Sequence, residues 1–199
     1  GLYRVGDFDL AGTIVGVLEE GRIIDGSRIR AGDLLIGLSS TGLHTNGYSL
    51  ARHVFFTKLK FAPHDRIPAL KRSAAAALLA VHRSYLGAVT ALRAEVPVHG
   101  LAHITGGGLV DNLPRVLPAG RRAVIRRRAW RVPDLFRFIQ EQGGVNQETM
   151  DRTFNLGIGM IAVVPRARGE EALRALRAAG ERPRCVGEIV TGGRGVEFV

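Results

Sequence analysis

The sequence LLIGLSSTGLHTNGYSLARHVFF, residues 34–56, decides the fold of this 199-residue chain. It opens with an apolar run at 34–38 that is short enough for a buried strand. A loop of small and polar residues follows at 39–47, and apolar residues then recur at helical spacing. A strand, a polar loop and a helix start together present free backbone N–H groups and the positive end of a helix dipole. The stretch therefore predicts a site for an anion such as phosphate.

Within this loop, His44 is the only titratable group. We take it as the candidate catalytic residue, acting as an acid or base or as a partner of phosphate. Thr45 or Asn46 is the predicted N-cap, because either side-chain oxygen can accept a first-turn N–H. The alternative is a plain strand–loop–helix connection with His44 solvated. The residues predicted to contact substrate or phosphate here are Ser40, Gly42, Thr45, Asn46 and Gly47.

A second glycine-rich loop, Thr105-Gly106-Gly107-Gly108, follows a short strand predicted at 98–104. Three glycines before a helix start let the backbone approach a ligand and point N–H groups at it. Such a run alone is more often a tight turn than a site, and it is neither a Walker A motif nor a dinucleotide fingerprint. Because two strand-end loops can converge on one crevice, we expect these four residues to line a wall facing the first loop.

Polar residues also precede a buried strand predicted at 157–164. Arg152 and Asn155 are expected at the site, with a solvent-facing Arg152 as the alternative. His99 and His103 fall on one face of the strand at 98–104, about 13 Å apart, so we discount them as a metal pair. The single cysteine, Cys185, provides no second ligand for a cysteine-based zinc site. The sequence therefore predicts no metal ligands.

The remaining segments are assigned from periodicity. Alternation predicts a strand at 9–19, and residues 23 and 24 are expected in another short strand. An alanine run and apolar residues at intervals of three and four predict the longest helix at 71–95. His82, Arg83 and Tyr85 lie within it and could reach a ligand, the alternative being a core-facing Tyr85 and a surface Arg83. The segments 186–190 and 195–199 flank Thr-Gly-Gly-Arg and predict a hairpin.

The composition is that of a globular protein, with 46% apolar and 23% charged residues. No apolar run approaches the roughly 18 residues of a membrane span, and no secretory signal is visible, so we expect no membrane partner. One cysteine fits a reducing cytoplasm. The chain starts without Met, which suggests a fragment or a processed chain.

The net charge of +10 comes almost entirely from arginine. It raises the possibility of nucleic-acid binding. The basic residues are nevertheless spread along the chain, and the dense run Arg126-Arg127-Arg128 lacks the rest of any recognised binding motif. We therefore predict a solvated arginine-rich surface and no nucleic-acid partner.

The residue sequences of three stretches are more specific evidence than the spacing of their residue types. These stretches are SSTGLHTNGYSLAR at 39–52, HITGGGLVDNLPRVLP at 103–118 and MDRTFNLGIGM at 150–160. In order and separation they resemble phosphoribosylformylglycinamidine cyclo-ligase, the aminoimidazole ribonucleotide synthetase of purine synthesis. The segments DLAGTIVGVLE at 9–19 and IIDGSRIRAGD at 23–33 are also similar, so the resemblance covers nearly the whole chain. The chain departs from the family at Val81, where members usually carry a proline.

This resemblance implies an α+β layered domain with a mixed β-sheet and packed helices. Residues 1–20 would be the last strand of a truncated N-terminal ATP-binding and dimerisation domain, and residues 21–199 the C-terminal domain. Family members are homodimers that use ATP and Mg²⁺ to convert formylglycinamidine ribonucleotide into aminoimidazole ribonucleotide. Both cofactors are held mainly by the N-terminal domain, so this chain is expected to carry part of the substrate site and to be inactive alone.

Two kinds of alternative stay open. The same superfamily includes formylglycinamidine synthetase, selenophosphate synthetase, thiamine-phosphate kinase and a hydrogenase-maturation protein, all of which are ATP-dependent. In a different class, the chain could be a non-catalytic basic binding module. The sequences GLHTNGYS and RTFNLGIGM favour the cyclo-ligase.

Overall fold

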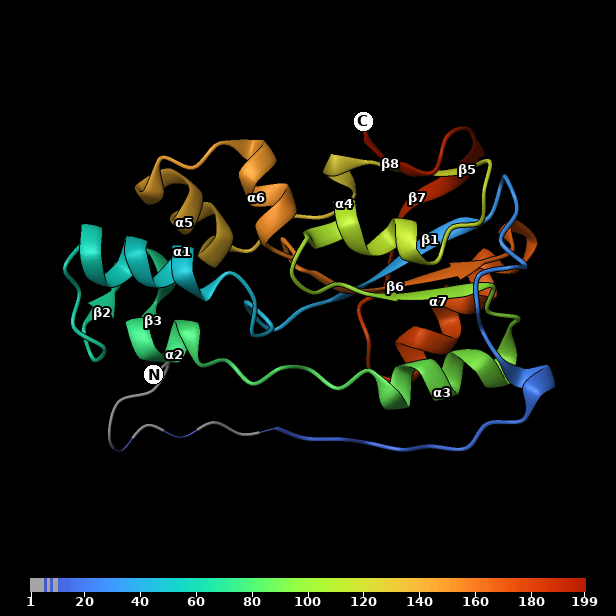
Figure 1. Cartoon of the computed structure of the whole chain (residues 1–199), viewed down its shortest axis with the longest axis horizontal. Coiled ribbons are helices and arrows are strands. Elements are labelled where there is room, and N and C mark those ends of the chain that lie inside the picture. Colours follow the sequence, from blue (N-terminus) through green and yellow to red (C-terminus); the bar gives the residue numbers. More distant parts are fainter. Residues whose placement is uncertain (1–5, 7, 9–10) are drawn as a thin grey trace.

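The computed structural model describes residues 6, 8 and 11–199 (Figure 1). These residues contain a six-stranded sheet, a small two-stranded sheet and seven α-helices. The strands are β1 (Leu34–Ser39), β2 (Arg66–Ile67), β3 (Arg72–Ser73), β4 (Gly100–His103), β5 (Arg121–Ile125), β6 (Ile158–Val164), β7 (Arg184–Thr191) and β8 (Gly195–Phe198). The helices are α1 (Tyr48–Arg52), α2 (Ala74–Leu78), α3 (Leu86–Glu95), α4 (Gly108–Asn112), α5 (Asp134–Gly143), α6 (Gln147–Thr153) and α7 (Gly169–Ala178). A π-helical turn at His53–Lys58 continues α1.

The large sheet has the order β4-β6-β1-β7-β5-β8. Strand β1 pairs antiparallel with β6 and with β7, and its four middle residues are buried, as expected for an apolar run covered on both faces. Strands β5 and β8 are parallel, so the sheet is mixed. The predicted α+β fold with a mixed sheet and packed helices is confirmed.

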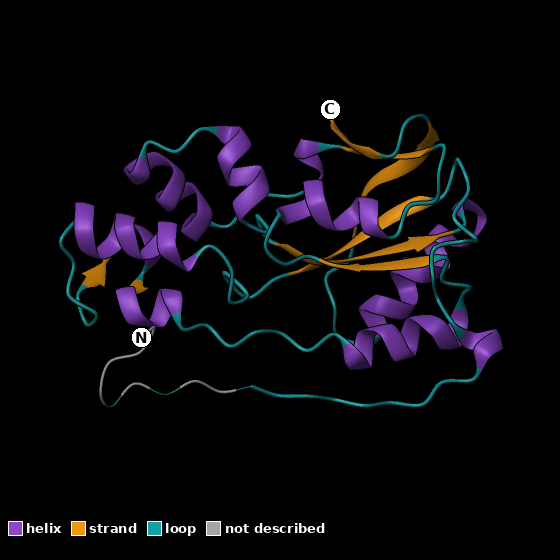
Figure 2. Cartoon of the chain, in the orientation of Figure 1, coloured by secondary structure: helices purple, strands orange, loops and turns teal. Residues whose placement is uncertain are grey.

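Helices cover both faces of this sheet (Figure 2). Helix α4 packs with Leu35 and Ile161 on one face, whereas α3 and α7 pack with Ile36 and Ala162 on the other. A third core lies beyond the end of the sheet, where α1, α2, α5 and α6 enclose Phe55. The loop at 40–47 joins β1 to α1 and therefore lies where the sheet meets this helical group.

Strand directions bring the two predicted loops together. Because β1 and β4 are both antiparallel to β6, they run in the same direction and end at the same edge of the sheet. Ser40 N–H donates to Gly157 O and Ile104 N–H donates to Gly159 O, so both loops start beside the beginning of β6. The expected convergence of the two strand-end loops is confirmed.

The prediction of a single helix at 71–95 is wrong. The alanine run forms α2, but the backbone leaves helical geometry at Leu79, and α3 begins only at Leu86. Tertiary contacts explain the break: the Tyr85 hydroxyl donates to Ser39 O (2.9 Å), and the His82 ring stacks on His44. No proline is needed for the interruption.

The predicted hairpin at the C-terminus is also wrong. Strand β5 lies between β7 and β8, pairing antiparallel with β7 and parallel with β8. Gly192 N–H donates to Gly120 O where the chain crosses the end of β5. Backbone groups that would have paired within a hairpin are satisfied by β5 instead.

The N-terminal strand predicted at 9–19 does not appear among the described residues. Asp9 and Leu10 lie outside them, and 11–19 carry no regular secondary structure, with Ile14 and Val17 almost fully exposed. Ile23 and Ile24, expected in a short strand, are not in one either. The alternating sequence predicted a strand, but within the described residues this segment has no neighbouring strand with which it could form backbone hydrogen bonds. The domain boundary near residue 20 stays a prediction.

Across the described residues, no helix is both long enough and apolar enough to cross a membrane.

Candidate functional site

The loop from Ser40 to Gly47 has an unusual backbone. His44 (φ 52°), Thr45 (φ 60°) and Gly47 (φ 70°) all adopt left-handed conformations, which non-glycine residues rarely do. Thr45 Oγ1 and Asn46 Nδ2 both donate to the His44 carbonyl (2.6 Å each), which holds this turn. Such strain in two successive residues is typical of functional loops.

The predicted N-cap is wrong as a consequence of this turn. Gly47 occupies the N-cap position of α1, and no side chain caps the helix. Thr45 and Asn46 cannot serve there because their side chains turn back to the His44 carbonyl.

His44 is buried rather than solvated, with 1% of its surface exposed. The Thr41 backbone N–H donates to Nε2 (3.0 Å), and the Thr41 hydroxyl oxygen lies 3.1 Å from the same nitrogen. Nδ1 is buried and has no hydrogen-bond partner among the described residues. Gly159 makes room for the ring, since a Cβ there would lie 2.8 Å from His44 Cε1 and 2.1 Å from the Tyr85 hydroxyl.

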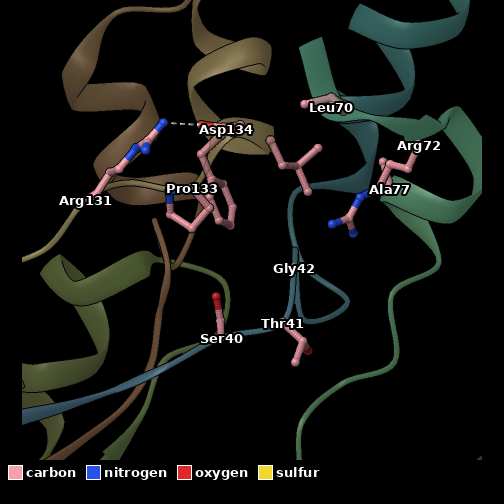
Figure 3. Close-up of a pocket in the computed structure, with 11 residues that line it drawn as sticks. Ser40, Thr41, Gly42, Leu70, Arg72, Ala77, Arg131, Pro133 and Asp134 are labelled. Atoms are coloured by element: carbon pink, nitrogen blue, oxygen red, sulfur yellow. Dashed lines mark hydrogen bonds and ion pairs between the residues drawn. The ribbon is translucent and has the colours of Figure 1, made fainter. Parts of the chain in front are cut away.

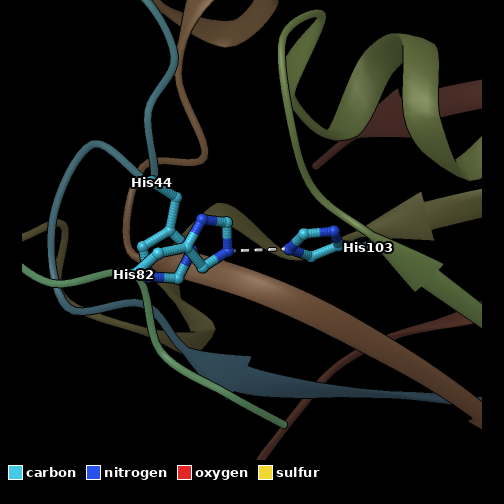
Figure 4. A group of neighbouring side chains, drawn as sticks. All are labelled: His44, His82 and His103. Carbon is cyan, nitrogen blue, oxygen red and sulfur yellow. Dashed lines mark hydrogen bonds between the residues drawn. The ribbon is translucent and has the colours of Figure 1, made fainter. Parts of the chain in front are cut away.

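Two further histidines extend this cluster (Figure 4). The His82 ring stacks on His44 with centroids 4.0 Å apart, and His82 Nε2 lies 3.0 Å from His103 Nε2. Burial, and then the charges of His82, His103 and Arg83, lower the pKa of His44 to about 4. Burial and His82 likewise lower the pKa of His103. At neutral pH the His44 ring is therefore uncharged.

The glycine-rich loop is held by a residue that the sequence analysis did not single out, the buried Asn112. Its Nδ2 donates to the carbonyls of Thr105, Gly106 and Gly108, and its Oδ1 accepts from the Thr105 hydroxyl. A Cβ at Gly106 would lie 3.3 Å from Asn46 Oδ1, so this loop faces the first one closely.

Asn155 is a buried tie between β6 and the β1 loop. Its Oδ1 accepts from the Ser40 hydroxyl (2.7 Å) and from Gly157 N–H (2.8 Å), and its Nδ2 donates to Gly42 O (2.9 Å). Asn155 lies beside the loop at 40–47, and its polar atoms hold that loop. Its contact with substrate stays a prediction.

Arg152 lies on the outer side of the glycine-rich loop. Its guanidinium pairs with Asp111 (3.0 Å) and with Glu148 (3.7 Å), and half of the side chain is exposed. The alternative of a solvent-facing Arg152 is therefore closer to what the structure shows.

A pocket of about 310 Å³ opens beside the first loop (Figure 3). Ser40, Thr41 and Gly42 line it, and Arg72 and Arg131 stand on either side of the loop. Asp134 also lines the pocket and pairs with Arg131 (3.2 Å). Thr41 borders both the pocket and the histidine cluster, since its hydroxyl donates to Val81 O while its backbone holds His44. Two arginines beside small polar residues suit an anionic ligand.

Comparison with known proteins settles the family. The model of the family described as "AIR synthase related protein, C-terminal domain" matches residues 30–199. The chain belongs to this family. The resemblance predicted from the three motifs is thereby confirmed.

Two curated relatives of this AIR synthase-related chain carry the same name. Phosphoribosylformylglycinamidine cyclo-ligase from Geotalea daltonii is 46% identical over 199 residues, which is 100% of this chain and 57% of that protein. The cyclo-ligase from Geobacter metallireducens gives the same identity and coverage. The chain therefore spans little more than half the length of the curated relatives it matches.

Among solved structures, thiamine-monophosphate kinase from Stenotrophomonas maltophilia K279a superposes with a TM-score of 0.62 at 14% identity, covering 91% of this chain and 54% of that one. The hydrogenase maturation protein HypE in complex with ATP gives a TM-score of 0.54 at 20% identity, covering 87% and 50%. At these identities the likeness concerns the fold alone.

In this AIR synthase-related domain the conspicuous arginine run has a structural use. Arg127 makes a two-pronged ion pair with the buried Asp151 (3.0 and 2.6 Å) and lies over the Phe198 ring. Arg126 donates to Cys185 O. The run thus fastens α6 and β8 to the end of β5.

Removing the Asn155 side chain is expected to loosen the site and the domain together. Asn155→Ala leaves three buried partners unsatisfied, and we expect it to lower the free energy of unfolding by about 3 kcal/mol. Urea denaturation measures this directly. The matched control, Ser40→Ala, removes only one of the three bonds and is expected to cost about 1 kcal/mol. Equal losses in the two variants would contradict the central role of Asn155.

Proposed function

We propose that this chain forms the substrate-binding half of a phosphoribosylformylglycinamidine cyclo-ligase. Such an enzyme closes the imidazole ring of aminoimidazole ribonucleotide from formylglycinamidine ribonucleotide at the expense of ATP. The proposal is supported by 46% identity to curated relatives of that name along the whole chain. The observation that carries it is the arginine-flanked pocket beside the loop at 40–47.

The pocket offers the groups that a ribonucleotide needs. A phosphate monoester carries close to two negative charges, and the guanidinium groups of Arg72 and Arg131 can donate paired hydrogen bonds to it. The Ser40 and Thr41 hydroxyls and the Gly42 backbone then face the rest of the ligand. We therefore assign phosphate to the arginine pair and not to Thr45 and Asn46, whose side-chain donors are engaged by the His44 carbonyl.

The glycine-rich loop does not line this pocket, and its assignment to the substrate site rests on its approach to Asn46 in the first loop. Asn112 fixes the carbonyls of Thr105, Gly106 and Gly108, which preorganises the backbone at the start of α4. Binding to a preorganised wall loses less conformational entropy than binding to a mobile loop.

Mg²⁺ does not fit the residues of this pocket. Asp134 is the only carboxylate among the described residues lining it, and it is paired with Arg131 and Arg137. Mg²⁺ requires oxygen ligands, usually carboxylates that are free to coordinate. We therefore place ATP and Mg²⁺, which activate the formyl oxygen as a phosphate leaving group, with the N-terminal part of the enzyme and its homodimer interface. No step is assigned to them within this chain.

The test separates the two substrates in the full-length enzyme. Arg72→Ala is expected to raise the KM for formylglycinamidine ribonucleotide at least tenfold and to leave the KM for ATP within twofold, because a charge-assisted contact contributes about 1.5–3 kcal/mol. Arg93→Ala, at an exposed position on α3, is the matched control and should change neither value. A change confined to the KM for ATP would put the nucleotide in this half and overturn the proposal.

A further inference from the structure

Three histidines from separate parts of the chain meet at one point beside β6. His44 comes from the β1 loop, His82 from the segment between α2 and α3, and His103 from the end of β4. One ring nitrogen from each lies within 4.8 Å of those of the other two. Figure 4 shows the His44 and His82 rings face to face, with the His82 ring directed at His103.

Imidazole nitrogens are the preferred ligands of Zn²⁺, and sites with three histidines and a water molecule are a recurrent arrangement. We propose that His44, His82 and His103 bind a Zn²⁺ ion, with water in the fourth position. This site is separate from the ribonucleotide pocket and does not depend on the proposed function. It also differs chemically from the Mg²⁺ of the ligase reaction, which requires oxygen ligands.

The distances allow the site with a small rearrangement. Tetrahedral zinc with Zn–N bonds of 2.0–2.1 Å places its nitrogen ligands about 3.3 Å apart. His82 Nε2 and His103 Nε2 are already 3.0 Å apart. The 4.8 Å limit on the remaining separations leaves at most roughly 1.5 Å to close. The rings of His44 and His82 must tilt out of their stack, and His82 can follow because its segment belongs to no helix or strand.

His44 can offer Nδ1 to a metal ion after a change of tautomer. The Thr41 hydroxyl donates to Val81 O, so it can only accept from the ring. Binding of Zn²⁺ at Nδ1 requires the proton on Nε2, which then donates to that hydroxyl and gives up the bond from Thr41 N–H. Nδ1 is buried and without a partner among the described residues, although buried polar atoms are normally hydrogen-bonded. A bound cation would supply the missing partner.

The surroundings allow access, and an ion pair offsets the positive charge of Arg83, which otherwise opposes a cation at the cluster. Arg83 is the nearest cation in the segment, and its guanidinium is paired with the buried Glu181 (2.8 Å). A hollow of about 390 Å³ lined by His82, His103 and Met160 opens to the surface beside the cluster. Through it an ion and its water can reach the exposed His103.

The test is calorimetric titration of the tag-free chain with Zn²⁺ after treatment with a chelator. One equivalent is expected to bind saturably, and Co²⁺ is expected to give the visible absorption of a four-coordinate site. His82→Ala and His103→Ala should each weaken Zn²⁺ binding at least tenfold, because losing a ligand costs no less than losing a residue that supports one. His82→Ala should fold, since its segment lies outside the helices and strands, and circular dichroism checks this.

The matched control is the double variant His53→Ala/His64→Ala, in which both histidines are exposed and lie outside the cluster. It should bind Zn²⁺ as the unmodified chain does. Absence of saturable binding would overturn the proposal. So would Zn²⁺ affinity that is unchanged in His82→Ala, because the ion would then sit on other histidines.

Discussion

Gly108→Ala is expected to lower the free energy of unfolding by at least about 3 kcal/mol. Gly108 has φ +59°, which a side chain disfavours, and a Cβ there would lie 1.9 Å from Asp151 O and 2.8 Å from Phe154 O. Both oxygens belong to the backbone, so the overlap can be relieved only by separating α4 from the end of α6. Urea denaturation measures the loss.

Gly120→Ala is the matched control for this variant. Gly120 also has a left-handed backbone, with φ +73°, but no atom lies within 4 Å of the position that its Cβ would take. Only the conformational cost applies, and a loss of about 1 kcal/mol is expected. Losses of equal size at the two positions would mean that backbone conformation, and not the packing of α4 on α6, dominates at Gly108.

Replacement of His44 is expected to lower kcat of the full-length enzyme at least 100-fold, because groups that transfer protons contribute about 10²–10⁴-fold. The ring is uncharged at neutral pH, since burial and the neighbouring His82, His103 and Arg83 lower its pKa to about 4. An uncharged imidazole can accept a proton from substrate, but it cannot form an ion pair with phosphate. We therefore propose that His44 acts as a base when no Zn²⁺ is bound to it.

Two variants separate proton transfer from support of the loop. His44→Ala removes the ring and the acceptor that holds Thr41 N–H, whereas in His44→Gln the amide oxygen can still accept that bond. Both are expected to lose activity equally in a steady-state assay. If His44→Gln kept kcat within twofold of the unmodified enzyme, the ring would only position the loop and the assignment as a base would be wrong.

Much of the fold was predictable because the large sheet depends on apolar runs of recognisable length. The strands at 34–39, 100–103 and 158–164 follow from such runs. The break between α2 and α3 was not predictable from local sequence. Alanine and leucine favour helix throughout that segment, and contacts of Tyr85 and His82 with the distant β1 loop decide its path.

The sequence predicted the two loops of the candidate site, but not the side chains that hold the second loop or line the pocket. The two loops were identified from their glycines and polar residues, and strand direction brings them together. Asn112 was missed, although an asparagine within the apolar stretch GLVDNLPRVL was an available signal. Arg72 and Arg131 were missed because they come from segments far apart in sequence. His82 was expected to be able to reach a ligand, but its stacking on His44 was not anticipated.

The central place of β1 has a consequence for how the chain folds. No two strands that are consecutive in sequence are hydrogen-bonded neighbours in the large sheet. Both pairing partners of β1, the strands β6 and β7, come from the last quarter of this sequence. Folding rates fall as the sequence separation of contacts grows, because loop closure must precede the contacts that reward it. During synthesis, the apolar β1 segment therefore leaves the ribosome long before either of its partners, so the large sheet can assemble only after β6 and β7 have been synthesised.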